Sequence, residues 1–287
     1  MGQWWAENLK TPVDGMDMLP KAFLNPDAGG WNQDVDLSKN IVHGVKVEKI
    51  ETCQNGIQSD GTKGTRVKVY ATNVDTGKRQ EFEGDSVFIT VPLPILRQMD
   101  VPLHNNQKTA ISNISYGCST KIMLQCKTRF WQKDVGQGGF SKTDMMIGQL
   151  HYPDYDGSGK SDDERGVLLV YTWDKDAVSF GAQNHQDAIK SAVTEIAKIH
   201  PEIMDEFEVG AVQAWCSDPT SQGAYASLHP YEYLDSLACL MKPVPPIYLA
   251  GEAISWTNGW IQGAIFSSLS QCLMFQLAQD ITPMKLI

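Results

Sequence analysis

The sequence IYLAGEA at residues 247–253, followed by SWTNGWIQGAI at residues 255–265, decides the fold expected for the rest of the chain. The apolar run 247–250 lies between a pair of prolines and a glycine, which predicts a short interior strand. Apolar residues recur at helical spacing between residues 265 and 277, so a helix is expected to begin at Gly263. Its free N–H groups would point toward an anionic or electron-rich ligand. Glu252, at the end of the strand, can accept hydrogen bonds from ribose-like hydroxyls.

This stretch resembles the C-terminal flavin-binding motif of the flavin monoamine oxidase and L-amino-acid oxidase family. In that family Gly-Glu is followed, after a spacer, by Gly-Trp-(Ile/Val)-x-Gly-Ala. The resemblance implies that the chain binds FAD, with Trp256 and Trp260 facing the substrate. The alternative for the motif alone is an ordinary α/β strand, loop and helix with two chance tryptophans. The cofactor-binding positions that the resemblance implies are Val47, Gly251, Glu252, Gly259, Trp260, Ile261 and Ala264.

Further segments resemble the same family, in the family's order. The sequence YGCSTKIML at 116–124, followed by Phe130 and Trp131, implies that Lys121 is catalytic and binds a water beside the reactive nitrogen of the flavin. A lysine there supplies positive charge where negative charge develops. In the same way Tyr171 is implied to bind the substrate carboxylate, and His151 is placed in the substrate site. A solvated lysine and a tyrosine at a strand edge are the plain alternatives.

One element of the family is missing from the sequence. No Gly-x-Gly-x-x-Gly fingerprint occurs, so the βαβ unit that binds pyrophosphate is absent from these 287 residues. The chain is therefore expected to be a subunit of a split or processed enzyme, a fragment, or a degenerate descendant. A complementary N-terminal chain or a homo-oligomer is the expected partner.

The predicted fold class is α/β, with mixed α+β character. Residues 1–113 and 244–287 are assigned to a partial FAD-binding domain, and residues 114–243 to a mixed-sheet substrate domain. Alternation in 41–50 puts Val47 and Ile50 on opposite faces of a strand. Asn55-Gly56 predicts a hairpin turn, and residues 82–92 one further strand. A helix over 185–200, capped by Asn184, is expected to be scaffold.

Composition excludes some classes of function. The net charge of −10 without a basic stripe argues against a nucleic-acid partner. No run approaches the ~18 apolar residues of a membrane span, and the N-terminus lacks a signal-peptide pattern, which favours a cytoplasmic location. The six scattered cysteines have no metal-ligand spacing, and several are expected to be small core residues, as in a reducing compartment. His185, His200 and His229 are expected on the surface.

The function that the resemblance implies is oxidative deamination of an L-amino acid. Hydride passes to the flavin, oxygen reoxidises it to give hydrogen peroxide, and the imino acid hydrolyses to a 2-oxo acid and ammonia. An amino acid or amine is the expected substrate. The alternatives are a flavin amino-acid monooxygenase, which would give an amide, and a truncated, non-catalytic binding protein of the same fold.

Overall fold

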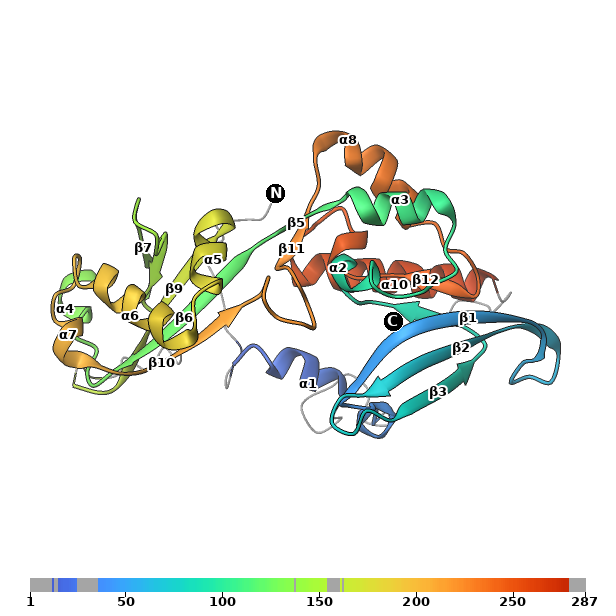
Figure 1. Cartoon of the computed structure of the whole chain (residues 1–287), viewed down its shortest axis with the longest axis horizontal. Helices are drawn as coiled ribbons and strands as arrows, with labels where there is room; N and C mark the ends of the chain where they lie inside the picture. The colour runs from blue at the N-terminus through green and yellow to red at the C-terminus, as the bar shows by residue number, and fades with distance from the viewer. Residues whose placement is uncertain are drawn as a thin grey trace, which may run out of the picture. The chain divides into compact units, whose positions relative to one another are not determined.

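The computed structural model describes residues 12, 15–24, 36–136, 138–153, 161 and 163–278. The chain forms two compact units, each assembled from separated stretches, and both combine helices with strands as the predicted class requires (Figure 1). Unit 1 consists of Met1–Gly44, Ile122–Tyr171 and Ile189–Ala211; unit 2 consists of Val45–Lys121, Thr172–Ala188 and Val212–Ile287. These boundaries differ from the predicted domain ranges 1–113, 114–243 and 244–287, which stay a prediction.

Unit 1 holds most of a five-stranded sheet. Its strand order is β10-β6-β9-β8-β7, with β8 antiparallel to both β7 and β9. Alternate residues of β9 are buried, as its period-two pattern requires. The strands are β6 (Ser119–Cys126), β7 (Phe140–Lys142), β8 (Gln149–His151), β9 (Gly166–Trp173) and β10 (Phe207–Ala214), and the short helices of this unit are α1 (Met18–Leu24), η2 (Ser38–Asn40), α4 (Gln132–Val135) and α7 (Ile203–Glu206).

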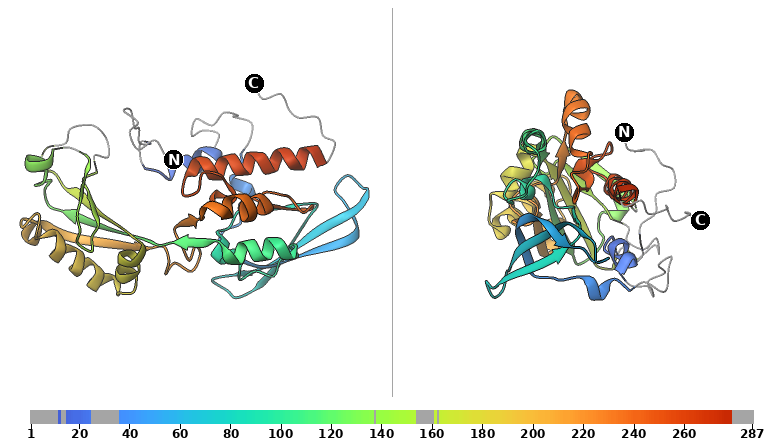
Figure 2. Two further views of the ribbon diagram at one scale, coloured as in Figure 1. Left: turned by 90° about the horizontal axis from the view of Figure 1, so that it is seen from above. Right: turned by 90° about the vertical axis from the view of Figure 1, so that its right-hand side faces the viewer.

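Helix α6 (His185–Ile196) covers one face of this sheet (Figure 2). The helix begins where expected, because the Asn184 side-chain oxygen accepts the backbone N–H of Asp187 at 3.0 Å. A glycine at 210 allows the close approach, since a Cβ there would lie 3.1 Å from the Ile189 side chain. The helix ends at Ile196, four residues before the predicted end.

His200 is buried, so the prediction of a surface histidine at this position is wrong. Its Nε2 lies 2.9 Å from the hydroxyl of Tyr152, which lies 2.8 Å from the Ser141 hydroxyl. The helix ends before His200, and the following turn places the ring edge-on to Phe130 and Tyr152. Periodicity assigned His200 to an exposed helix end and could not show these partners. His185 and His229 are exposed, as expected.

The burial of His200 predicts loss of stability in acid. Desolvation lowers the pKa of His200, and the carboxylates of Glu202 and Asp134 offset part of that effect. As the pH falls, the unfolded chain therefore binds a proton at His200 at a higher pH than the folded chain does. The stabilisation that neutral His200 contributes is complete above the ordinary histidine pKa of about 6.5 and declines as the pH falls through that value. We expect His200→Gln to flatten the fall in urea midpoint between pH 7.5 and 5.5. His185→Gln is the exposed control, and an unchanged slope in His200→Gln would contradict the prediction.

Unit 2 contains three small sheets. An antiparallel meander is formed by β1 (Val45–Ile57), β2 (Lys63–Asn73) and β3 (Arg79–Gly84). Strands β4 (Val87–Ile89) and β12 (Ile247–Leu249) pair in parallel, and β5 (Ser115–Gly117) pairs antiparallel with β11 (Tyr225–Ser227). The helices of this unit are α2 (Leu93–Leu96), α3 (Asn105–Asn113), α5 (Asp174–Gly181), α8 (Pro230–Glu232), the π-helical η3 (Tyr233–Leu237), α9 (Ala238–Leu240), η4 (Glu252–Ile254) and α10 (Ile261–Ala278).

Three details of the meander differ from the predictions. A bulge between Val47 and Lys49 shifts the register, so Ile50 is buried in the core against which Val47 packs. Asn55-Gly56 lies within β1 beside a second register shift, and the turn follows it, closed by Gln58 N–H donating to the Thr62 carbonyl. The single strand predicted over 82–92 is divided between β3 and β4, which belong to different sheets.

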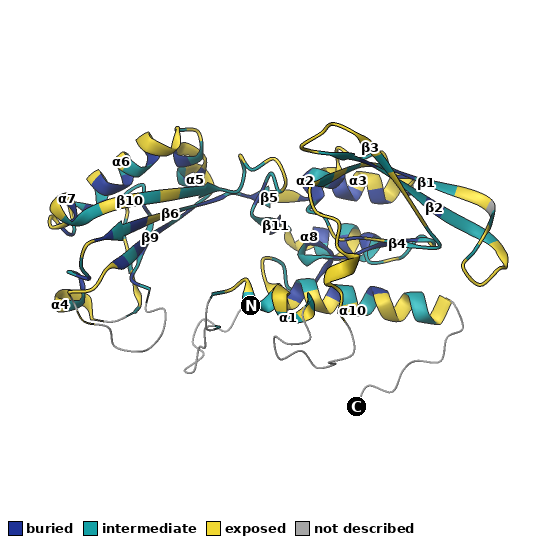
Figure 3. Ribbon diagram, turned by 90° about the horizontal axis from the view of Figure 1, so that it is seen from below, coloured by how far each residue is buried: buried dark blue, intermediate teal, exposed yellow. Residues whose placement is uncertain are grey.

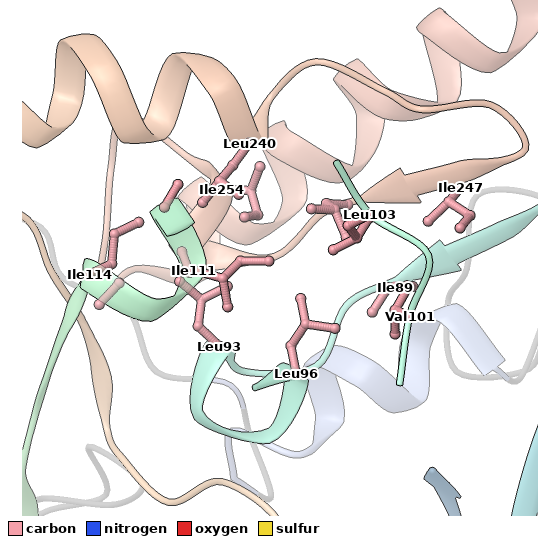
Figure 4. Packing of buried hydrophobic residues seen from close by; sticks show 14 of the residues in the cluster. Ile89, Leu93, Leu96, Val101, Leu103, Ile111, Ile114, Leu240, Ile247 and Ile254 are labelled. Carbon is pink, nitrogen blue, oxygen red and sulfur yellow. The ribbon is translucent and has the colours of Figure 1, made fainter. Parts of the chain in front are cut away.

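Strand β12 lies in the core of unit 2, which confirms the predicted interior strand. All three of its residues are buried, and its partner β4 contributes Ile89 from the other side of the ladder. The side chains pack around this pair of strands and the two helices that follow β4 (Figure 4). Core members include Ile89, Leu93, Leu96, Val101, Leu103, Ile111, Ile114, Leu240, Ile247 and Ile254.

Cys118 and Cys216 form a disulfide, a pairing that their spacing in the sequence did not predict. Their Cα atoms are 5.5 Å apart, although 98 residues separate them in the sequence. Such bonds form mainly in oxidising compartments, so this pair does not favour the reducing compartment that the composition fits but does not require. Cys126 is buried as expected, whereas Cys53 and Cys272 are exposed.

Helix α10 buries its small and polar face rather than its apolar one. It begins at Ile261, two residues before the expected start, and its buried positions are Gly263, Ser267 and Gln271. Exposed positions recur along the helix (Figure 3). The apolar spacing therefore does not mark the face that packs on this chain. Across the described residues, no helix has the length and apolarity to cross a membrane. The exposed large apolar residues of α10 are Ile261, Ile265, Phe266, Leu269, Leu273, Met274 and Leu277.

Candidate functional site

The two parallel strands β4 and β12 end side by side in unit 2. The backbone N–H of Ala250 donates to the Ile89 carbonyl at 2.9 Å, which extends the ladder by one residue. The chain then turns at Gly251, whose φ of +120° is a conformation that glycine adopts readily. A cavity of about 180 Å³ lies here. Its lining includes Thr90 and Pro92, which follow β4, and Gly251 and Glu252, which follow β12. The carboxyl ends of parallel strands are where open α/β sheets bind ligands.

Glu252 is held by three donors from the chain itself. Its Oε1 accepts the hydroxyl of Tyr116 at 3.0 Å and the backbone N–H of Ala226 at 2.9 Å, and its Oε2 accepts the N–H of Gly259 at 2.8 Å. An ionised carboxylate has about four acceptor positions. About one acceptor position at Glu252 is therefore left for a ligand, so this side chain can bind about one ribose-like hydroxyl rather than several.

The loop 255–260 and the start of α10 are fixed to the same turn. The Asn258 side-chain amide donates to the backbone carbonyl of Glu252 at 3.0 Å. The Ser267 hydroxyl lies between the N–H of Gly251, at 2.9 Å, and its carbonyl, at 2.7 Å. These contacts bring Gly251, Glu252 and Gly259 together in one local structure, with Ile261 at the first position of the helix and Ala264 in its first turn.

The remaining predicted residues of unit 2 lie in the loop 255–260, on β6 and on β1. Trp256 and Trp260 of the loop are each about half exposed, at 52% and 45%, and Trp256 stacks on Tyr233 at 6.1 Å between ring centroids. Lys121 is half-buried and is the third residue of β6. Val47 lies on β1 opposite Ala71 and packs against the core that contains β12.

Unit 1 brings two of the four predicted substrate residues together. The His151 and Tyr171 rings lie 6.0 Å apart between centroids, on the neighbouring strands β8 and β9. His151 also stacks on Phe140 at 5.1 Å, and its Nε2 lies 3.0 Å from the side-chain oxygen of Gln149. The aromatic group formed by Phe140, His151 and Tyr171 is a surface against which an apolar or aromatic side chain could pack.

Sequence reasoning missed the groups that hold Glu252. Tyr116 belongs to the motif that pointed to Lys121, yet nothing in the sequence linked it to a carboxylate 136 residues away. Ala226 contributes a backbone N–H, which no residue type could have indicated. The one signal that could have raised Tyr116 is its place in that motif. Among the described residues, no cluster of three or more histidine, cysteine or acidic side chains could hold a metal ion.

Curated L-amino-acid oxidases are similar to this chain in sequence. L-amino-acid oxidases of Siganus canaliculatus and Demansia vestigiata are 27% and 31% identical over 259 and 263 residues, covering 89% and 90% of this chain. Those matches cover 45% and 46% of the two oxidases, so the chain spans about half the length of the curated relatives it matches.

Solved structures give the same fold. Wild-type putrescine oxidase bound to putrescine superposes with a TM-score of 0.67 at 19% identity, over 93% of this chain and 53% of that one. The model of one family, described as flavin containing amine oxidoreductase, matches residues 5–272. Because that match covers nearly the whole sequence, the chain belongs to the family of flavin-containing amine oxidoreductases.

Proposed function

We propose that this chain forms the C-terminal half of an FAD-dependent oxidase that deaminates an L-amino acid. The observation that carries the proposal is the strand, Gly-Glu turn, loop and helix at the ends of β4 and β12, in a chain of the flavin-containing family. Bound FAD would supply the acceptor for two electrons and a proton, and oxygen would reoxidise it to yield hydrogen peroxide. The products would be a 2-oxo acid and ammonia. Similarity to L-amino-acid oxidases supports the amino acid as substrate.

The residues of unit 2 fit part of a flavin site. Gly251 and Gly259 leave room for close backbone approach, and the remaining acceptor position of Glu252 suits one cofactor hydroxyl. The cavity of about 180 Å³ is smaller than a typical cofactor site. This chain therefore supplies one wall of the site, to which we also assign Val47, Trp260, Ile261 and Ala264.

In this proposal, residues of the chain orient the substrate and place positive charge beside the reacting ring of the cofactor. Lys121 would hold a water and place positive charge beside the reacting ring, where negative charge develops. Tyr171, with His151 beside it, would bind and orient the amino acid so that its α-hydrogen points at the acceptor. Trp256 and Trp260 present exposed aromatic faces that would exclude water from an apolar side chain.

A complementary N-terminal polypeptide is part of this proposal. Helix α10 has no charged residue, and it exposes seven large apolar side chains. A helix that exposes this many large apolar side chains is expected to pack against a partner. The parallel sheet of β4 and β12 has only two strands among the described residues, although parallel sheets are normally covered and extended. A partner that adds strands and covers α10 would complete both features and would account for the half-length match.

We expect the isolated chain to bind FAD weakly, with a dissociation constant of roughly 10 µM or above. Its sequence contains no Gly-x-Gly-x-x-Gly turn to hold the pyrophosphate at a helix N-terminus. The measurement is flavin fluorescence during titration of the monodisperse chain, together with the visible spectrum of the protein purified alone and after co-expression with an N-terminal half. Flavin bands and amino-acid oxidation that appear only with the partner support the proposal. Stoichiometric tight binding and oxidation by the chain alone would refute its dependence on a partner, and a colourless assembled protein would favour a non-catalytic binding protein.

A further inference from the structure

Tyr116 and Ala226 approach Glu252 from a pair of antiparallel strands. The ladder of β5 and β11 places Tyr116 opposite Ala226. The Tyr116 hydroxyl and the Ala226 N–H both donate to Oε1 of Glu252, at 3.0 and 2.9 Å. One short ladder thus aims two donors at the same carboxylate oxygen, one from a side chain and one from the backbone.

The ring of Tyr116 is closely confined. A Cβ at Gly223 would lie 2.6 Å from its Cδ1, so the glycine is needed for the ring to occupy this place. The N–H of Leu93, at the start of α2, donates to the tyrosine oxygen at 3.3 Å, which directs the hydroxyl hydrogen toward Glu252. Burial, followed by the charge of Glu252, raises the pKa of Tyr116, so the hydroxyl keeps its proton and remains a donor.

The other oxygen of Glu252 carries the constraint to the loop. Oε2 accepts the N–H of Gly259 at 2.8 Å, two residues before α10 begins. With Oε1 fixed by Tyr116 and Ala226, the carboxylate cannot rotate without breaking a charge-assisted hydrogen bond. The position of the loop 255–260 therefore depends on a side chain that lies on β5.

We propose that Tyr116 is a positioning residue of the flavin site, acting through Glu252. It holds the carboxylate in the orientation that fixes Gly259 and leaves one acceptor position for a cofactor hydroxyl. This inference rests on the proposed function for its link to the flavin, but its local consequence can be measured in the chain alone.

The test measures amide hydrogen exchange at Gly259 and FAD affinity in five variants. Tyr116→Phe keeps the ring and removes the donor, and Glu252→Gln keeps one acceptor oxygen and removes the other. We expect each to speed exchange at Gly259 about tenfold, the usual effect of losing one hydrogen bond to a charged group. The double variant should be no more than about threefold faster than Glu252→Gln, because the two groups act as one unit. Tyr248→Phe, in buried β12, is the matched control and should exchange like wild type.

Gly223→Ala tests the same contact by another route, because it displaces the Tyr116 ring without removing the hydroxyl group. It should reproduce the faster exchange at Gly259 and, like Tyr116→Phe, weaken FAD binding about tenfold. Wild-type exchange at Gly259 in Tyr116→Phe, or independent multiplication of the two single effects, would overturn the inference. FAD affinity is compared in the assembly with the N-terminal half. If wild type and variants bind FAD equally there while exchange at Gly259 changes as expected, the positioning of Glu252 by Tyr116 stands and the proposed flavin site fails.

Discussion

Replacing Gly263 by alanine is expected to lower the free energy of unfolding by about 2 to 3 kcal/mol, although alanine has the higher helix propensity. A Cβ at this position of α10 would overlap the backbone carbonyl oxygen of Thr257 and the hydroxyl of Ser255. Backbone atoms cannot move aside as a flexible side chain can, so the loop must shift, and overpacking of this kind costs about 1–3 kcal/mol or more. In an ordinary helix interior the same change would stabilise by about 1 kcal/mol.

Urea unfolding, followed by tryptophan fluorescence, measures this effect, because Trp256 and Trp260 lie in the loop that must move. Gln262→Ala, at the neighbouring exposed position, is the control and should change stability by no more than about 0.5 kcal/mol. A Gly263→Ala variant as stable as wild type would show that the loop 255–257 yields without cost. That result would remove the tight packing between loop and helix on which the proposed site depends.

Removing the Cys118–Cys216 disulfide is expected to cost about 4 kcal/mol of stability. The two cysteines are 98 residues apart in the sequence, and a cross-link that closes so long a loop strongly restricts the unfolded chain. It also joins two segments that hydrogen bonds already hold together, since Trp215 N–H donates to the Ser119 carbonyl at 3.1 Å and Ala224 N–H to the Gly117 carbonyl at 2.9 Å. The native structure is therefore expected to persist without the bond, with the loss arising mainly in the unfolded state.

The measurement is urea unfolding of the variant in which both cysteines are replaced by serine, compared with oxidised wild type. Cys53→Ser, at an exposed free cysteine, is the matched control. Reductant should lower the wild-type midpoint to that of the double variant and leave the double variant unchanged. Equal midpoints for oxidised wild type and the double variant would contradict the expected contribution of the bond.

Local patterns sufficed for several elements of this protein. The apolar run before Gly251 and the Asn184 cap of α6 are each specified within a few residues, because strand burial and helix capping depend on near neighbours. The motif around Gly251 and Glu252 likewise lies in one continuous stretch. Its similarity to flavin-containing oxidoreductases was visible in the sequence for that reason, and the family match confirms it.

Other features needed the tertiary structure, because they join residues far apart in the chain. The bulge in β1 turned Ile50 into the core, and period-two counting fails wherever one extra residue is inserted. The partners of His200 come from positions 48 residues and more away, and those of Cys118 from 98. Spacing along the sequence carries no information about such pairs.

Within the site itself, helix α10 and Glu252 also show what the sequence determines and what only the tertiary structure determines. The composition of α10 specified an apolar helix, but only packing decided that Gly263, Ser267 and Gln271 are buried while Phe266 and Leu269 stay exposed. The sequence placed a carboxylate at 252, whereas the ladder of β5 and β11 decided that Tyr116 and Ala226 would hold it. Residue type determines what a group can donate or accept, and the meeting of distant strands determines which groups are near enough to do so.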